Sequence, residues 1–316
     1  MGTESTLSTK SEPSTEPTVT SPARTAPAAP SASDLGRLEA GLDQLQRVDP
    51  VARRGTFGSR LLWPLGALAA VVSLWQILAW SGIKRDDLLP GPGQVAAIVA
   101  EQAASGALAE AVGTSLARGG LGFLIAVAIG TPIALVLAQL PALRRAVGPL
   151  ISGLQVLPSV AWVPAAIIWF GLTDATVYFV VLMGATPSII NGLLAGIDTI
   201  PPHYAQVGHV LGASRWQHTL LITLPAALPG YLGGLKQGWA FSWRSLMAAE
   251  IIAVGGSIGF GLGSLLQQGR DLSDMGLVIT AILAILVVGI LVELLLFAPV
   301  ERALLARRGL AKGHSA

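Results

Sequence analysis

Cysteine is absent from this chain of 316 residues, so neither a disulfide framework nor a thiolate metal site can form. Charged residues make up only 12% of the sequence, against about 25% in an ordinary soluble domain. The net charge of +2 is too small to indicate a nucleic-acid partner. The pattern G-x-x-x-x-G-K-[ST] is missing, so the chain does not bind ATP through a P-loop of its own. No catalytic triad or carboxylate pair stands out, and we predict neither enzyme activity nor a bound cofactor.

Long apolar runs occur where charge is scarce, and hydrophobic residues form 52% of the chain. Because a membrane-spanning helix needs about 20 apolar residues, the sequence offers six candidates: 61–81, 114–139, 149–170, 175–197, 226–253 and 276–299. Trp63, Trp75 and Trp80 lie near the ends of the first, as interfacial anchors do. The sequence therefore predicts an all-α integral membrane protein with about six transmembrane helices.

Composition divides the chain into further segments. Residues 1–33 are rich in Ser, Thr, Pro and Ala and lack aromatic residues, which favours disorder. Residues 34–60 carry leucines at helical spacing and predict an amphipathic cytoplasmic helix, which lies either on the protein surface or on the membrane or a partner. The other expected segments are a first span with an interfacial segment (61–111), the main membrane domain (112–300) and a basic cytoplasmic tail (301–316).

Lysine and arginine are distributed unequally between the two sides that these spans define, and this bias sets membrane orientation. One side carries eleven of them: Arg47, Arg53, Arg54, Arg60, Arg144, Arg145, Arg215, Arg302, Arg307, Arg308 and Lys312. The other side carries four: Lys84, Arg85, Arg118 and Arg270. The count places both termini and the loop 198–225 in the cytoplasm, in a multi-pass protein of the cytoplasmic membrane.

Small residues and prolines indicate how the spans pack. Gly122, Ala126 and Gly130 recur every four residues, a spacing that lets helix backbones approach closely in lipid. Pro158 in the third span and Pro187 in the fourth each remove a backbone donor, and the freed carbonyl needs a neighbour or water. Broken helices of this kind usually line a shared interior, and simple kinking explains any single proline equally well.

The fifth span carries side chains that are unusual in lipid: Lys236, Gln237, Trp239, Trp243, Arg244 and Glu250. Helical spacing divides them between two adjacent faces, with Gln237 and Arg244 on the smaller one. A charge at mid-bilayer costs at least about 2.5 kcal/mol, so such residues face a protein interior or a water path. One interpretation is that Lys236 snorkels and the other charges pair with neighbouring helices, Glu293 being a candidate partner. The other is that the set lines a translocation path in which Arg244 favours an anion.

The most informative stretch is 206–225, QVGHVLGASRWQHTLLITLP, which is too polar for lipid and lies between two spans. Nine residues separate Gly212 from Ile222, and one residue separates Ile222 from the pair Leu224 and Pro225. This spacing resembles the cytoplasmic loop of ABC-importer permeases, in which a short coupling helix docks on an ATPase. The family usually has Glu-Ala-Ala six residues before the glycine, whereas this chain has Gln-Val-Gly at 206–208.

Three further stretches, 114–138, 157–175 and 234–252, resemble the membrane domain of type I ABC importers, most closely the nitrate/sulfonate/taurine group. The resemblance implies the type I permease fold with a cytoplasmic coupling helix. It implies an ATPase-docking loop made by Gln206, Leu211, Gly212, Ala213, Ser214, Arg215, Trp216 and Pro225. It also implies a second permease copy, a separate ATPase subunit that binds the ATP, and an extracytoplasmic binding protein that delivers an aliphatic sulfonate, taurine or nitrate.

Other interpretations of the sequence stay open. A secondary transporter driven by an ion gradient would show inverted repeats with paired broken helices, which the two halves do not display. A membrane scaffold without transport would need no ATPase. The glycine run at 255–263 lacks the Lys-Ser/Thr of a phosphate cradle and is expected to be a flexible external loop. His203, His209 and His218 lack a usual metal-ligand spacing, so we expect no metal site.

Overall fold

The computed structural model describes residues 57–85, 87–255 and 258–307, and these ranges contain helices and connecting turns but no strand. The segment expected at 1–33, most of the amphipathic segment (34–56) and the end of the basic tail (308–316) lie outside the described residues. The chain divides into two compact units, Met1–Leu65 and Gly66–Ala316. The second unit holds the expected membrane domain and is described below.

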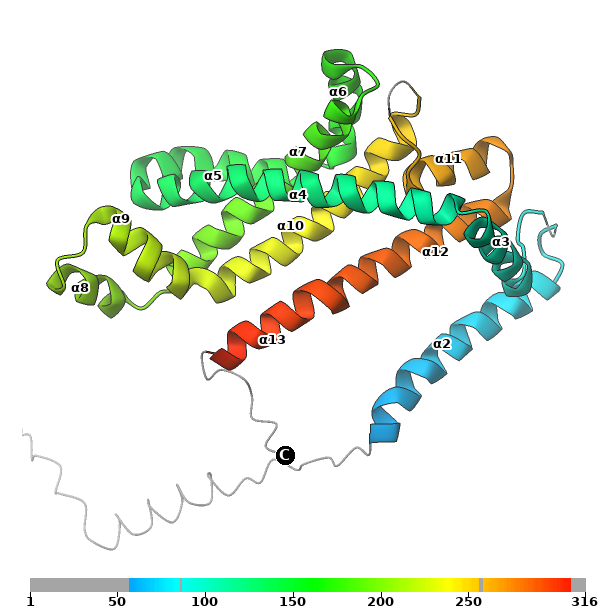
Figure 1. The fold of residues 1–316 in the computed structure, drawn as a ribbon, viewed down its shortest axis with the longest axis horizontal. Coiled ribbons are helices and arrows are strands. Elements are labelled where there is room, and N and C mark those ends of the chain that lie inside the picture. The colour runs from blue at the N-terminus through cyan, green and yellow to red at the C-terminus, as the bar shows by residue number, and fades with distance from the viewer. Residues whose placement is uncertain (1–56, 86, 256–257, 308–316) are drawn as a thin grey trace, which may run out of the picture. The chain divides into compact units, whose positions relative to one another are not determined.

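Figure 1 shows the helices and labels those named α. They are α2 (Phe57–Trp80), α3 (Pro92–Ala104), α4 (Ala107–Gln139), α5 (Pro141–Val156), η1 (Ser159–Trp162), α6 (Val163–Phe170), α7 (Asp174–Asp198), α8 (Pro202–Val210), α9 (Arg215–Gln217), η2 (His218–Thr223), α10 (Leu224–Ile252), α11 (Leu262–Asp271), α12 (Met275–Val292), η3 (Glu293–Phe297) and α13 (Ala298–Arg307). The segment η1 is a 3₁₀ turn, and η2 and η3 are π-helical. Because α12, η3 and α13 follow one another without a break, they form one long helical run.

Within the described residues, four helical runs are long and apolar enough to cross a membrane: Leu62–Trp80, Ala107–Gln139, Asp174–Asp198 and Met275–Arg307. They coincide with four of the six expected spans. The expected span 149–170 is instead a pair of helices, Pro141–Val156 and Ser159–Phe170, that meet at 96° around Pro158, so the count rises to five if the pair is one span. The remaining expected span, 226–253, is α10, a continuous helix of 29 residues, but its glycines, prolines and charges make it less apolar than the others. The all-α membrane fold is confirmed.

Helices α7 and α10 make the closest backbone approach in the unit. A Cβ added to Gly192 of α7 would lie 2.2 Å from the Cα of Gly234 in α10, and one added to Gly230 would lie 2.5 Å from the Cα of Gly196. No side chain fits between the two backbones at these points. Glycines four residues apart thus form the contact that small residues are expected to make in lipid.

The small-residue stripe predicted in the second span packs α4 against α7. A Cβ on Gly122 would lie 2.8 Å from Cγ1 of Val181, and one on Gly130 would lie 3.1 Å from Cγ2 of Ile189. Ala126, between the two glycines, is fully buried. The prediction is confirmed, and it places α7 between α4 and α10 at the centre of the bundle.

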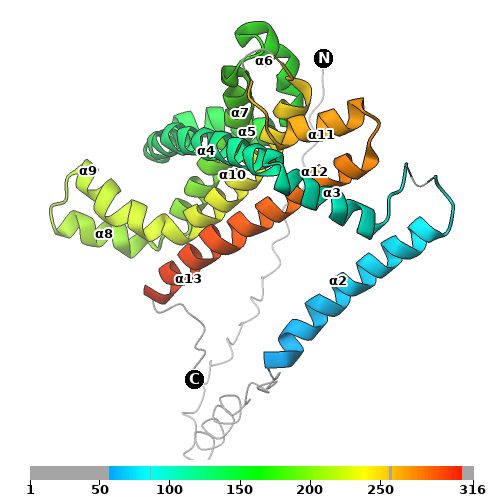
Figure 2. The same cartoon turned by 45° about the vertical axis from the view of Figure 1, so that its right-hand side comes forward.

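Ion pairs mark the two ends of this bundle. At one end, Arg144 in the first turn of α5 forms a two-point ion pair with Asp198, the last residue of α7, with Nη1 2.8 Å from Oδ1. At the other end, Arg118 of α4 pairs with Asp174, the first residue of α7. The segment from α8 to η2 lies at the first end, away from α6 and α11, in both views (Figures 1 and 2).

Candidate functional site

The segment 199–223, which we call the elbow, projects from the joined ends of α7 and α10 (Figure 1). Its turn depends on Gly212, whose φ of +68° lies in the left-handed region that favours glycine. The Ala213 N–H donates to the carbonyl of Gly208 at 3.0 Å and closes the turn. Two short helices, α8 and α9, therefore meet at the turn formed by Gly212, Ala213 and Ser214.

The second arm of the elbow starts with a capping box. The Gln217 N–H donates to Oγ of Ser214 at 3.3 Å, and the Ser214 N–H donates to Oε1 of Gln217 at 2.9 Å. This reciprocal pair satisfies donors that a helix start leaves free. From Arg215 the chain stays helical through η2 into α10, so Pro225 lies in the first turn of α10 and does not end a separate segment.

The two arms pack through Gly208. A Cβ at this position would lie 2.7 Å from Cδ2 of His218 and 2.7 Å from Cδ1 of Ile222, so only glycine leaves room for both side chains. The His218 ring is also held by a hydrogen bond between its Nδ1 and Oγ1 of Thr223, 3.2 Å apart. Gly208 is the third position of the divergent Gln-Val-Gly triplet. The departure from Glu-Ala-Ala thus coincides with a bulky partner on the opposite arm.

The surface of the elbow is apolar and accessible in the chain alone. Val210 is 87% exposed, Leu211 76% and Trp216 72%. A groove of about 860 Å³ runs beside them, lined by apolar side chains that include Tyr204 and Leu221. Exposed apolar surface of this kind is the feature expected of a protein interaction site. Gln206, Ser214 and Arg215 are exposed around it, Ala213 and Pro225 are half-buried, and all the predicted docking residues gather here.

Along α10, the polar residues of the predicted path take different positions. Lys236 lies with its Nζ 2.8 Å from Oε1 of Glu293 and 2.9 Å from Oε2 of Glu301. Glu293 is the partner that the sequence suggested. Glu301 was missed, although the two carboxylates are eight residues apart on one helical run and so share a face. Lys236 therefore ties α10 to the last helix.

Trp239, Trp243 and Glu250 are buried within this chain, whereas Gln237 and Arg244 are exposed. The two tryptophans stack with ring centroids 6.0 Å apart inside the main apolar core. The division of these residues into buried and exposed sets matches the two helical faces expected from spacing. The role of the whole set in a translocation path stays a prediction.

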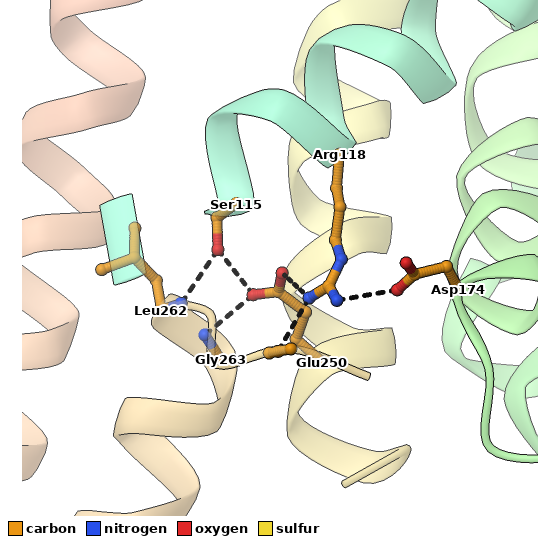
Figure 3. Close-up of polar contacts among 7 residues, drawn as sticks. Ser115, Arg118, Asp174, Glu250, Leu262 and Gly263 are labelled. Carbon is orange, nitrogen blue, oxygen red and sulfur yellow. Dashed lines mark hydrogen bonds and ion pairs between the residues drawn. The ribbon is translucent and has the colours of Figure 1, made fainter. Parts of the chain in front are cut away.

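Glu250 is fully buried, and its carboxylate is satisfied by groups from two other elements, α4 and α11 (Figure 3). Oε2 accepts a hydrogen bond from Oγ of Ser115 at 2.7 Å and one from the N–H of Gly263 at 3.0 Å. Oε1 lies 3.4 Å from Nη1 of Arg118. Buried charges are stable only when paired and hydrogen-bonded in this manner. The network connects α4, α10 and the start of α11.

Arg118 extends the network outward. Its Nη1 donates to the carbonyl of Gly259 at 3.0 Å, and its Nη2 donates to Oδ1 of Asp174 at 2.7 Å (Figure 3). Arg118 therefore lies inside α4 and is buried, whereas the sequence predicted a position on one side of the membrane. The signal was available, because residue 118 falls within the span predicted at 114–139 and a charge there needs a partner.

The glycine run beyond α10 packs around the same carboxylate. A Cβ on Gly261 would lie 2.5 Å from Oε1 of Glu250, and one on Gly263 would lie 2.5 Å from its Cβ. The Leu262 N–H donates to Oγ of Ser115 at 2.9 Å. The described part of this loop, from residue 258 onward, is therefore held by hydrogen bonds from its own chain, in contrast to the flexible loop expected.

Arg244 differs from the other charges of α10, since no carboxylate of the described residues lies within ion-pair distance of it. Its guanidinium lies 4.6 Å from the centroid of the Phe241 ring. It lines a cavity of about 260 Å³ at the break between α5 and η1, together with Gln155 and Ser159. The sequence did not predict that Arg244, Gln155 and Ser159 would meet, because the bend that brings them together is a tertiary feature.

The long apolar helices, the projecting elbow and the buried polar network of α10 are those of a multi-pass membrane protein. The chain belongs to the family described as binding-protein-dependent transport system inner membrane component, whose model matches residues 105–302, and within it to the ABC-importer permeases of the nitrate, sulfonate and taurine group. Members of this family are transport components that work with a binding protein, as the family name states.

Two relatives illustrate the similarity. The taurine transport system permease protein TauC of Escherichia coli is 28% identical over 245 residues, which cover 73% of this chain and 88% of the relative. The nitrate import permease protein NrtB of Synechococcus elongatus is 30% identical over 233 residues, which cover 71% and 81%. Among solved structures, a chain of the MetNI methionine ABC transporter in inward-facing conformations matches with a TM-score of 0.53 and 20% identity, over 62% of this chain and 95% of that one. That likeness supports the type I importer fold alone.

Proposed function

We propose that this chain is the permease subunit of an ATP-driven importer that carries a small anion across the cytoplasmic membrane, with an aliphatic sulfonate, taurine or nitrate as the cargo. Two copies of the permease enclose the path, an extracytoplasmic binding protein delivers the anion, and two separate subunits bind and hydrolyse ATP. Both termini and the elbow lie in the cytoplasm. The cargo class rests on the solutes for which the relatives are named, taurine and nitrate, each of which bears a negatively charged group with several oxygens.

The observation that carries this proposal is the elbow. It presents exposed apolar side chains, Val210, Leu211 and Trp216, on a turn that is fixed by Gly212. A partner that buries such side chains in a groove gains most of its affinity from them, because buried aromatic and aliphatic anchors dominate protein interfaces. A groove that changes shape during ATP hydrolysis then moves the elbow with it.

The connections of the elbow explain how this motion reaches the membrane domain. The helical run from Arg215 to Ile252 has no break, so its two ends move together. The first arm of the elbow, α8, follows α7, and the end of α7 is joined to α5 by the ion pair between Asp198 and Arg144. The close glycine contact between α7 and α10 keeps these helices together. Motion of the elbow therefore displaces α10, α7 and the broken pair α5–α6 as one body.

The test is Gly212→Val in the full importer, reconstituted in proteoliposomes with its ATPase subunits and binding protein. A residue other than glycine at left-handed φ costs about 1–2 kcal/mol, and a β-branched one is strained further. We expect the variant to insert in the membrane but to lose at least tenfold in ATP-dependent uptake and in ATPase stimulation. Gly113→Val is the matched control, because Gly113 has ordinary φ and no atom within 4 Å of an added Cβ.

Normal ATP-dependent uptake by Gly212→Val would overturn the coupling role of the elbow. Uptake that follows an ion gradient and needs no ATPase subunit would instead identify a secondary transporter. The orientation is tested separately: a protease added outside intact cells should not cut within 199–223, and cleavage there would refute the cytoplasmic placement.

A further inference from the structure

The charges of α10 are compensated with one exception. Lys236 has Glu293 and Glu301, and Glu250 has Arg118. Arg244 has no carboxylate of the described residues within ion-pair distance, and its Nε donates to the carbonyl of Ala240, one turn earlier in its own helix. A guanidinium on a helix of this kind needs a counter-charge or water, because an isolated charge within a membrane domain is costly.

The cavity beside Arg244 is small. It measures about 260 Å³, whereas pockets for drug-sized ligands measure about 300–1,000 Å³. It exists because α5 ends at Val156 and the chain turns by 96° before η1 and α6. A continuous helix through this region would fill the space with its own side chains. The break thus makes room for a solute of only a few heavy atoms.

The polar groups of the cavity are turned so that they offer hydrogens. Asn191 Nδ2 donates to Oε1 of Gln155 at 2.7 Å, so the amide oxygen of Gln155 is engaged and its NH₂ group is left to donate. Ser245 donates to Oγ of Ser159 at 2.7 Å, so the hydroxyl hydrogen of Ser159 is left in the same way. Both supporting residues come from other helices, α7 and α10.

Arg244 adds the charge and the geometry. A guanidinium offers five N–H groups in a planar fork, which suits the oxygens of a carboxylate, sulfonate or nitrate better than the point charge of lysine does. Its position over the Phe241 ring, 4.6 Å from the centroid, restricts its motion before a ligand arrives. The cavity therefore combines one cation with two oriented neutral donors, and no acidic side chain lines it.

We propose that this cavity, lined by Arg244, Gln155 and Ser159, is a subsite for the oxyanion group of the solute within the permease itself. The proposal rests on the proposed function, since it concerns the anion that the importer carries. It extends that function by giving the permease its own chemical selection for anions with several oxygens, after the binding protein has released the solute.

The experiment measures anion binding to the purified complex of permease and ATPase subunits, without the binding protein, by titration calorimetry. Nitrate and methanesulfonate are the probes, and ethylammonium is the cationic control. We expect both anions to bind, Arg244→Gln to weaken binding at least tenfold, and Arg244→Lys to weaken it less, because a charge-assisted contact is partly kept. Arg270→Gln, which removes an exposed arginine of α11 that does not line the cavity, should leave binding unchanged.

Two donor deletions sharpen the test. Gln155→Leu and Ser159→Ala should each weaken anion binding roughly three- to tenfold, as expected for the loss of one neutral hydrogen bond. Ser152→Ala, which removes an exposed hydroxyl from the same helix α5, should have no effect. Graded losses of this kind distinguish a built donor set from attraction by a single charge.

The inference is overturned if the wild-type complex binds neither anion, or if Arg244→Gln binds both as tightly as the wild type. Neither result affects the proposed function, which is decided by ATP-dependent uptake in the Gly212→Val variant. Loss of coupling in Gly212→Val together with unchanged anion binding in Arg244→Gln would therefore refute the subsite and leave the importer assignment in place.

Discussion

Replacing Glu250 by leucine removes the buried carboxylate around which α4, α10 and the start of α11 are joined. Ser115 and the N–H of Gly263 each lose an acceptor, at 2.7 and 3.0 Å, and Arg118 loses one of its two carboxylate partners. Arg118 keeps Asp174 and the carbonyl of Gly259. The variant thus breaks one side of the network and leaves the other side intact.

The expected loss follows from these contacts. Removing one partner of a buried ion pair costs about 3–5 kcal/mol, most of it from the groups left without a partner. Because Arg118 retains Asp174, we expect Glu250→Leu to fall near the lower end, about 3 kcal/mol in the free energy of unfolding. Glu250→Gln keeps an acceptor oxygen for Ser115 and Gly263 and should cost about 1–3 kcal/mol.

The assay is a double-mutant cycle on the purified protein in detergent micelles, with unfolding followed by circular dichroism. The double variant Arg118→Met/Glu250→Leu removes both charges and leaves only Asp174, which is half exposed to solvent. Its loss of unfolding free energy should be smaller than the sum of the losses in the two single variants by about 1–3 kcal/mol, because neighbours in one network are coupled. Glu110→Leu, at an exposed position of α4, is the control and should change stability by less than about 0.5 kcal/mol. Additive single losses would refute the network as a coupled unit.

Two further variants test the packing of the bundle and of the elbow. Gly192→Leu places a side chain where a Cβ would already lie 2.2 Å from the Cα of Gly234, so we expect the free energy of unfolding to fall by at least about 3 kcal/mol or the variant to fail to fold. Gly153→Leu is the control and should be tolerated, because no atom lies within 4 Å of an added Cβ. Equal stability of the two variants would contradict the close crossing. Gly208→Ala puts a methyl group 2.7 Å from the His218 ring and 2.7 Å from Cδ1 of Ile222, so it should lower ATPase-coupled uptake. Gly208→Ala/His218→Ala should recover uptake in part, because the contact with Ile222 remains. No recovery would show that residues 208 and 218 do not compensate each other.

The elbow was predictable because its signals are local. The turn depends on a glycine, Gly212, that adopts a left-handed φ. The next helix starts with a serine cap, Ser214, and a glutamine three residues later, Gln217. All three lie within six consecutive residues. The α4 stripe of Gly122, Ala126 and Gly130 was predictable for the same reason, since its period is that of one helix. The equivalent spacing of Gly184, Ser188, Gly192 and Gly196 in α7 carried the same signal and was missed.

The polar network was missed because its members are far apart in the sequence. Ser115 and Glu250 are separated by 135 positions, and Arg118 and Asp174 by 56. Spacing along α10 placed Glu250 on the same helical face as Trp239 and Trp243 but could not name its partners. The glycine run was interpreted as a loop without a ligand, since the carboxylate that it surrounds belongs to the preceding helix.

By itself the sequence determined the membrane class, the helical content and the position of the elbow, because hydrophobic length, helical period and turn chemistry are written in consecutive residues. Only the tertiary structure decided which charges of α10 are compensated, and that α5 and α6 meet at a bend beside Arg244. Those features depend on side chains that come together from different helices, and the distances between helices are set by packing at glycines that no single stretch specifies.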